Sequence, residues 1–155
     1  MRQIKFRAKR LSDNKWVYGY FNGMDQTEEL GEVVCIKDSD EMYNFCSKET
    51  LGEFTSLYDK NGKGIYAGDI VKFLDSEYMV IFEVGTFGLG SYIQIDYDKI
   101  EKEVEETTDN DYSGVHCDNF ISLWTIYWNF NCDDDVITQI EVIGNIYENK
   151  ELIKR

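Results

Sequence analysis

The chain has 155 residues, of which 30 are acidic and 16 are basic, so its formal net charge is −14. Hydrophobic residues form 43% and aromatic residues 15% of the chain, which excludes a disordered acidic protein and provides enough apolar surface for a core. The charge disfavours non-specific binding to duplex nucleic acid and docking on an anionic membrane, because both depend on basic side chains.

The charge is unevenly distributed along the chain. Residues 1–20 contain six basic side chains and one acidic one, a net charge of +5, and the remaining residues carry −19. The first basic residues alternate with Ile4, Phe6 and Ala8, which is the two-residue period of a strand. We therefore expect a strand with a solvated basic face. The alternative is a strand that contacts nucleic acid.

Short runs of β-branched and aromatic residues, separated by turn residues, follow one another through most of the chain. This pattern is typical of an all-β protein built as one or two small barrels, which we favour, or as a sandwich. Residues 38–50 are polar and are predicted to be irregular. The first two predicted strands form a hairpin. The predicted strands lie at residues 4–8, 16–20, 31–36, 51–57, 65–66, 70–73, 78–84, 92–97 and 136–146.

The clearest turn runs from Asp59 to Lys63. Its Asn61-Gly62 pair predicts a type I′ hairpin turn, in which both central residues have positive φ. Gly68 is expected to take a strained or left-handed conformation before the next strand. The carboxylate of Asp69 is expected to accept backbone N–H groups where that strand begins.

Residues 98–113 are dense in acidic side chains and contain only two lysines. A short solvated helix at 99–106 would place Ile100 and Val104 on one face, and a mobile loop is the alternative. The aromatic segment that follows contains Trp124, Tyr127 and Trp128. We expect these three side chains to form core or a subunit interface, with stacking on a ligand as the alternative.

The residues with catalytic or metal-binding chemistry form no recognisable motif. The four cysteines lack C-x-x-C spacing, which indicates reduced thiols in a cytoplasm. His116 is the only imidazole and is expected to be structural. The sequence around Asp59 lacks the ligands of a calcium loop, and the glycines at 85–90 lack the order of a nucleotide-binding loop. We predict no catalytic residue, cofactor or metal, and hence no enzyme.

Three segments carry a resemblance to a known family. They are the hairpin at 4–19, the stretch FTSLYDKNGKGIYAGDIVKF at 54–73 and the stretch EVIGNIYENKEL at 141–152. Together and in this order they resemble the YopX family. The resemblance implies a small protein encoded by phages or prophages, with an SH3-like barrel in its central-to-C-terminal part and no established site residues. It implies structural turn and signature roles for Asn61, Gly62, Gly68, Asp69 and Gly144.

These observations predict a single domain over 1–155, or two β lobes at about 1–57 and 58–155. The favoured function is an accessory protein of the bacterial host cytoplasm that binds a protein, either a second copy of itself or a host factor with a basic surface. The alternative is a small β-barrel module that binds nucleic acid, which the net charge disfavours. No membrane association is expected, because no apolar stretch approaches the length of a membrane helix.

Overall fold

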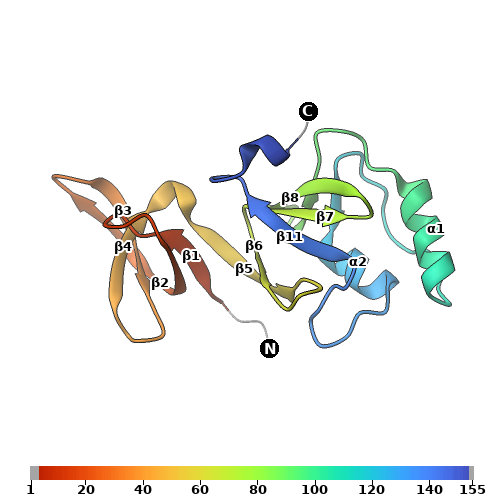
Figure 1. Cartoon of the computed structure of the whole chain (residues 1–155), viewed down its shortest axis with the longest axis horizontal. Coiled ribbons are helices and arrows are strands. Elements are labelled where there is room, and N and C mark those ends of the chain that lie inside the picture. Colours follow the sequence, from red (N-terminus) through yellow and green to blue (C-terminus); the bar gives the residue numbers. More distant parts are fainter. Residues whose placement is uncertain (1–3, 154–155) are drawn as a thin grey trace. The chain divides into compact units, whose positions relative to one another are not determined.

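The computed structural model describes residues 4–153 and shows a mostly β chain (Figure 1). The chain divides into two compact units, with the boundary between Ser56 and Leu57. The prediction of an all-β, small barrel-like fold with a short helix is confirmed. The elements of the first unit are β1 (Phe6–Lys9), β2 (Trp16–Thr27), β3 (Gly31–Lys37), β4 (Tyr43–Ser47), the 3-10 turn η1 (Lys48–Thr50) and β5 (Gly52–Tyr58), whose last two residues belong to the second unit.

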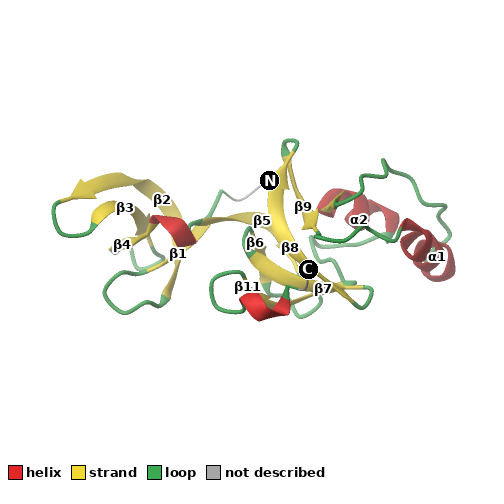
Figure 2. Cartoon of the chain, turned by 90° about the horizontal axis from the view of Figure 1, so that it is seen from above, coloured by secondary structure: helices red, strands yellow, loops and turns green. Residues whose placement is uncertain are grey.

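The first unit is an antiparallel sheet in the order β4-β3-β2-β1-β5 (Figure 2). The predicted hairpin is present, with Ala8 opposite Val17. Alternate residues of these strands point to one side and form a small core, because successive side chains of a strand face opposite ways. This inner core consists of Ala8, Val17, Val34, Ile36 and Cys46.

The second unit contains a five-stranded antiparallel sheet in the order β10-β9-β8-β7-β11. The SH3-like description of this part stays a prediction. The elements of the unit are β6 (Gly64–Tyr66), β7 (Asp69–Phe73), β8 (Ser76–Glu83), β9 (Thr86–Gly90), α1 (Tyr97–Thr107), β10 (Phe120–Ser122), α2 (Leu123–Asn129), β11 (Ile140–Asn145) and the 3-10 turn η2 (Lys150–Leu152).

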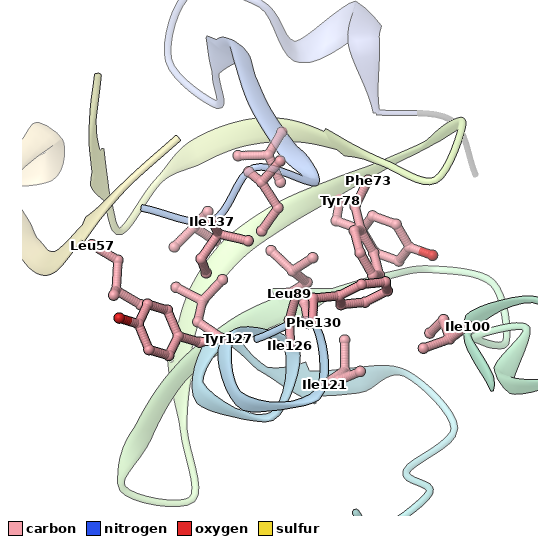
Figure 3. Close-up of a cluster of buried hydrophobic side chains, with 14 of the residues drawn as sticks. Leu57, Phe73, Tyr78, Leu89, Ile100, Ile121, Ile126, Tyr127, Phe130 and Ile137 are labelled. Carbon is pink, nitrogen blue, oxygen red and sulfur yellow. The ribbon is translucent and has the colours of Figure 1, made fainter. Parts of the chain in front are cut away.

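The main hydrophobic core lies in the second unit (Figure 3). Phe73 and Leu89 come from the sheet, Ile126 from α2 and Ile137 from the segment before β11, and all four are almost fully buried. Each such side chain stabilises the fold by about 1.5–3 kcal/mol relative to an exposed one. The core therefore joins the sheet to both helices of this unit.

Helix α1 agrees with the helix predicted in the acidic segment and starts two residues earlier. The Asp96 side chain caps it by accepting from the Lys99 backbone N–H at 3.1 Å. Ile100 and Val104 lie buried on one face together with Tyr97. A polar helix is stable here because this stripe packs on the core.

One buried carboxylate joins the central turn to the last strand. Asp59 Oδ1 accepts the backbone N–H groups of Asn61 and Lys63, each at 2.9 Å, and Oδ2 accepts that of Val142 at 2.9 Å. The turn is closed by Gly62 N–H, which donates to the Asp59 carbonyl at 3.0 Å. The type I′ prediction is wrong, because Gly62 has a φ of 78° and Asn61 is not among the residues with positive φ. The Asp59 side chain stabilises the turn without a left-handed Asn61.

The predicted strand at 92–97 is wrong, and β9 occupies the glycine-rich residues before it instead. At two positions inside β9, neighbouring atoms leave no room for a side chain, so only glycine fits. A Cβ at Gly88 would collide with the ring of Phe120, and one at Gly90 would lie 2.6 Å from the Ile81 side chain. Glycine therefore marks tight packing within this strand rather than its end.

Two further expectations about strands differ from the structure. Strand β4 lies in the segment predicted to be irregular, where Asn44 and Cys46 face inward and Tyr43 and Phe45 face outward. The predicted strand at 136–146 is shorter, because a turn in which Ile140 N–H donates to the Ile137 carbonyl precedes β11. The turn shifts the alternation, so that Ile137 and Ile140 are both fully buried.

We predict that Asp59→Ala lowers the free energy of unfolding by about 3 kcal/mol or more, because three backbone N–H groups lose a charged acceptor. Asp59→Asn keeps one acceptor oxygen and should lose less. Urea unfolding followed by circular dichroism measures both. Asp134→Asn is the control, since this carboxylate is exposed and Asn tolerates its φ of 55°. An Asp59→Ala protein as stable as the Asp134→Asn control would contradict the prediction.

Candidate functional site

Helix α2 separates the predicted aromatic cluster into buried and exposed members. Ser122 caps the helix by accepting from the Trp124 backbone N–H at 3.2 Å. Tyr127 faces the core, whereas Trp124 and Trp128 are 38% and 68% exposed. The core role expected for the cluster is therefore realised at Tyr127, and the two tryptophans point outward from the same helix face.

The exposed tryptophans line a groove of about 590 Å³ beside the segment that leaves α1. The ring centroids of Trp124 and Trp128 lie 6.4 Å apart with an interplanar angle of 30°. We call this site the tryptophan groove. Its lining residues are Asp109, Asn110, Asp111, Ser113, Trp124, Thr125, Trp128 and Asn129.

Two asparagines hold the wall of the tryptophan groove in place. Asn129 is buried, and its side chain donates to the Ser113 carbonyl at 2.8 Å and accepts from the Ser113 N–H at 2.8 Å. Its amide also donates to the Thr125 carbonyl of α2 at 2.7 Å. Asn110 donates to the Asn129 carbonyl at 3.1 Å. These bonds fix the 109–113 segment against α2, so the groove is pre-formed.

The charge of the groove is negative. Asp109 and Asp111 are exposed, and none of the described residues that line the groove is basic. An indole face attracts a cation through its ring quadrupole, and a carboxylate beside it adds Coulomb attraction. The chemistry of this groove therefore suits a cationic group with an apolar stem, such as an Arg or Lys side chain.

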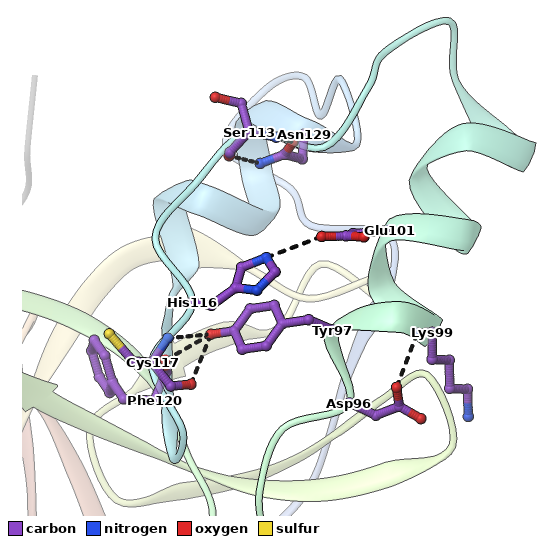
Figure 4. A network of polar contacts seen from close by, with 9 residues as sticks. All are labelled: Asp96, Tyr97, Lys99, Glu101, Ser113, His116, Cys117, Phe120 and Asn129. Carbon is purple, nitrogen blue, oxygen red and sulfur yellow. Dashed lines mark hydrogen bonds and ion pairs between the residues drawn. The ribbon is translucent and has the colours of Figure 1, made fainter.

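His116 lies in a second cluster, where the same loop meets α1 (Figure 4). Its Nε2 is 3.0 Å from Glu101 Oε1, and its ring stacks on Tyr97 at 4.0 Å with an interplanar angle of 8°. The Tyr97 hydroxyl accepts from the Cys117 N–H at 3.1 Å and lies 3.2 Å from the Phe120 carbonyl. Burial raises the pKa of Tyr97. These contacts fasten the far end of the loop that forms the groove.

The predicted turn residues lie at strand ends in the second unit. Asn61 and Gly62 form the turn that binds Asp59. Gly68, with a φ of 94°, donates to the Val80 carbonyl at 2.9 Å. The Asp69 carboxylate accepts from the Tyr66 N–H at 2.8 Å. Gly144 follows an irregularity in the pairing of β11 with β7, and its missing Cβ leaves room for the Asn149 side chain. None of these residues lines the tryptophan groove.

Sequence reasoning did not find the asparagines or the two aspartates of the groove. Asn129 is a polar residue directly between the aromatic residues Trp128 and Phe130, and that contrast was the available signal. Asp109 and Asp111 were indistinguishable from the other acidic residues of their segment, because only the fold brings them beside Trp124 and Trp128.

The thiols and carboxylates of the described residues are not grouped as metal ligands. The four cysteines are free, and burial raises the pKa of the Cys46 thiol to about 11. Within residues 4–153, no group of three or more His, Cys, Asp and Glu side chains is arranged to hold a metal ion. Among these described residues, no helix is both long and apolar enough to cross a membrane.

The fold and site define a mostly β protein with two antiparallel sheets, two short helices and a pre-formed acidic groove lined by tryptophan. The family described as YopX protein matches residues 5–154, nearly the whole chain. The chain belongs to the YopX family, as its sequence resemblance predicted. No match to a curated protein was found. Membership of the family supports a phage-type protein and does not by itself assign an activity.

We predict that Asn129→Ala lowers the free energy of unfolding by about 2–3 kcal/mol, because the Ser113 N–H and two carbonyls lose their partners. Hydrogen exchange at the Ser113 amide should become faster, since its acceptor is removed. Asn129→Asp is the matched variant, which keeps the acceptor and loses both donor bonds. It should protect the Ser113 amide better than Asn129→Ala does. Unchanged exchange at Ser113 in Asn129→Ala would contradict this prediction.

We predict that Tyr112→Phe is neutral or stabilises the protein by up to about 1 kcal/mol, because the buried Tyr112 hydroxyl has no hydrogen-bond partner among the described residues. Burial, with smaller effects of Tyr97 and Glu101, raises the pKa of Tyr112 to about 12 from 10. Tyr112 therefore ionises more readily in the unfolded state, and the free energy of unfolding should be unaffected by this group below pH 10 and fall between pH 10 and about 12.

The measurement is urea unfolding of both proteins at pH 7, 10 and 12. The free energy of unfolding should fall less above pH 10 in Tyr112→Phe than in the unchanged protein. The fall in the free energy of unfolding that remains in Tyr112→Phe includes a contribution from Tyr97, because burial also raises the pKa of Tyr97. Identical pH profiles would show that Tyr112 does not contribute.

Proposed function

We propose that this chain is a phage-type accessory protein that acts by binding a basic segment of a partner protein in the cytoplasm of a bacterial host. The observation that carries the proposal is the tryptophan groove, where Trp124 and Trp128 stand exposed beside the carboxylates of Asp109 and Asp111. An Arg or Lys side chain would lay its stem on an indole face and place its charge near a carboxylate.

The charge of the second unit supports a cationic partner. Residues 57–155 contain 20 acidic and eight basic side chains, so this unit carries −12 of the total −14. A field of one sign steers an oppositely charged partner toward the surface and raises its association rate. The same field repels phosphates, so the tryptophan groove disfavours nucleic acid despite its aromatic rings.

The arrangement of His116 supports a binding role rather than catalysis. A Ser-His or Cys-His mechanism needs the imidazole within hydrogen-bond reach of a nucleophile. His116 instead pairs with Glu101 and stacks on Tyr97, and both contacts hold the loop beside α1. We therefore propose that His116 is structural and that the chain is not an enzyme.

The test is calorimetric titration of the full chain with a peptide of alternating Gly and Arg, at 20 and 150 mM NaCl. Binding should be tighter at the lower salt concentration, because exposed charges are screened by salt. Trp128→Ala should weaken binding about 5-fold or more, since a cation–π contact contributes roughly 1 kcal/mol. The double variant Asp109→Asn/Asp111→Asn should weaken it and reduce its salt dependence.

The matched control is the double variant Asp133→Asn/Asp134→Asn, which removes the same charge from exposed residues that do not line the groove. It should bind nearly as tightly as the unchanged protein. Equal losses in both double variants would show attraction to the overall charge alone and would overturn the groove assignment. No binding at 20 mM NaCl would overturn the proposed function at this site.

A further inference from the structure

The sheet of the first unit has a second face that its core does not use. In β1 to β4, the residues of this outer face point away from the inner core, because side chains alternate along β-strands. Its exposed part is rich in aromatic side chains, whereas Arg7, Val33 and Cys35 on the same face are buried. We call it the outer face, and its aromatic and basic residues are Arg7, Lys9, Trp16, Tyr18, Tyr20, Lys37, Tyr43 and Phe45.

One row across the outer face joins two tyrosines and a lysine. Tyr20 of β2 pairs with Lys37 of β3, which pairs with Tyr43 of β4. Tyr20 is 67% and Tyr43 61% exposed. Lys37 Nζ lies 5.6 Å from the Tyr43 ring centroid. Phe45, which is 51% exposed, continues the surface two residues along β4.

A glycine holds this row together. A Cβ at Gly19 would collide with the Lys37 carbonyl, so β2 and β3 approach closely only because residue 19 lacks a side chain. The aromatic rings of the row are therefore presented by paired backbone rather than by a loop, and their spacing across the sheet is set by the strand separation of about 4.8 Å.

The charges on the outer face are mostly positive. The Arg7 guanidinium lies 4.5 Å and the Lys9 ammonium 5.4 Å from the Trp16 ring centroid. The acidic strand residue that shares this face, Asp25, lies toward its far end, opposite Val33. The whole first unit carries only −2, from eight basic and ten acidic residues in 1–56. Phosphate repulsion is therefore concentrated in the other unit.

We propose that the outer face binds single-stranded nucleic acid, with bases stacked on Tyr20, Tyr43 and Phe45 and with Lys37 beside the phosphates. Aromatic rings on an open sheet surface, with cations between them, are the arrangement that stacks unpaired bases. A duplex would not use this face, because its bases are already stacked. The basic N-terminal strand thus acts together with aromatic residues of its own sheet, and not with the tryptophan groove.

The test is fluorescence anisotropy of 5′-labelled dT15 and rU15 with the full chain between 20 and 150 mM NaCl. We expect binding at low salt, with a salt slope of roughly −0.7 for each cation that contacts a phosphate of a single strand. Tyr20→Ala and Tyr43→Ala should each weaken binding about 5-fold or more. Lys37→Gln should make the salt slope less steep.

Several controls keep the proposal falsifiable. Tyr20→Phe and Tyr43→Phe keep the ring and should retain binding, which separates stacking from loss of folding. Leu30→Ala removes a side chain of similar exposure (54%) from the β2–β3 turn and should bind normally. Trp124→Ala/Trp128→Ala should also bind normally, so that failure at this face and failure of the tryptophan groove are distinguishable.

Three results would overturn the proposal. The first is no binding of dT15 or rU15 at 20 mM NaCl. The second is equal affinity for a 15-base-pair duplex, which would indicate charge attraction without base stacking. The third combines two observations: the protein binds no oligonucleotide, and Tyr20→Ala changes its molecular mass in solution. That result would show that the outer face is a contact between copies of the chain.

Discussion

The second unit depends on the buried carboxylate of Asp59. Its two oxygens accept three backbone N–H groups, two from its own turn and one from Val142, which is 83 residues away in the chain. Lys60 N–H adds a bond to the Ile140 carbonyl at 2.9 Å. A buried carboxylate is stable only when such donors compensate its lost hydration, so the turn and the last strand must form together. That closure completes the sheet on which both helices pack.

The two proposed surfaces differ in the charges that stand beside their exposed aromatic residues. The second unit carries most of the negative charge, and its exposed tryptophans stand beside Asp109 and Asp111. The first unit is nearly neutral, and its exposed tyrosines stand beside Lys37. Aromatic rings accept either cations or stacked bases, and the neighbouring charges select between these ligands. The net charge of the whole chain hides this difference.

Much of the fold was predictable because the periodicity of apolar residues along the sequence indicates its strands and one of its helices. The alternation of Phe6 and Ala8 with basic residues and the spacing of Ile100 and Val104 both have the correct period for the observed elements. The pattern failed where close packing overrides propensity. No strand was predicted at 86–90, although neighbouring atoms fill the space of the missing Cβ atoms of Gly88 and Gly90 in β9. Helix α2 was missed, since its aromatic residues have low helix propensity.

The sequence by itself determined the β-rich class, the hairpin, the polar helix with one apolar face and the uneven charge. Only the tertiary structure decided which aromatic residues face solvent and which charges stand beside them. In a strand, Ile126 would share a face with Trp124 and Trp128, whereas the turn of about 100° per residue in α2 buries Ile126 and leaves both tryptophans exposed. The Asn129–Ser113 bonds then bring the acidic segment to them, a long-range contact that no local pattern encodes.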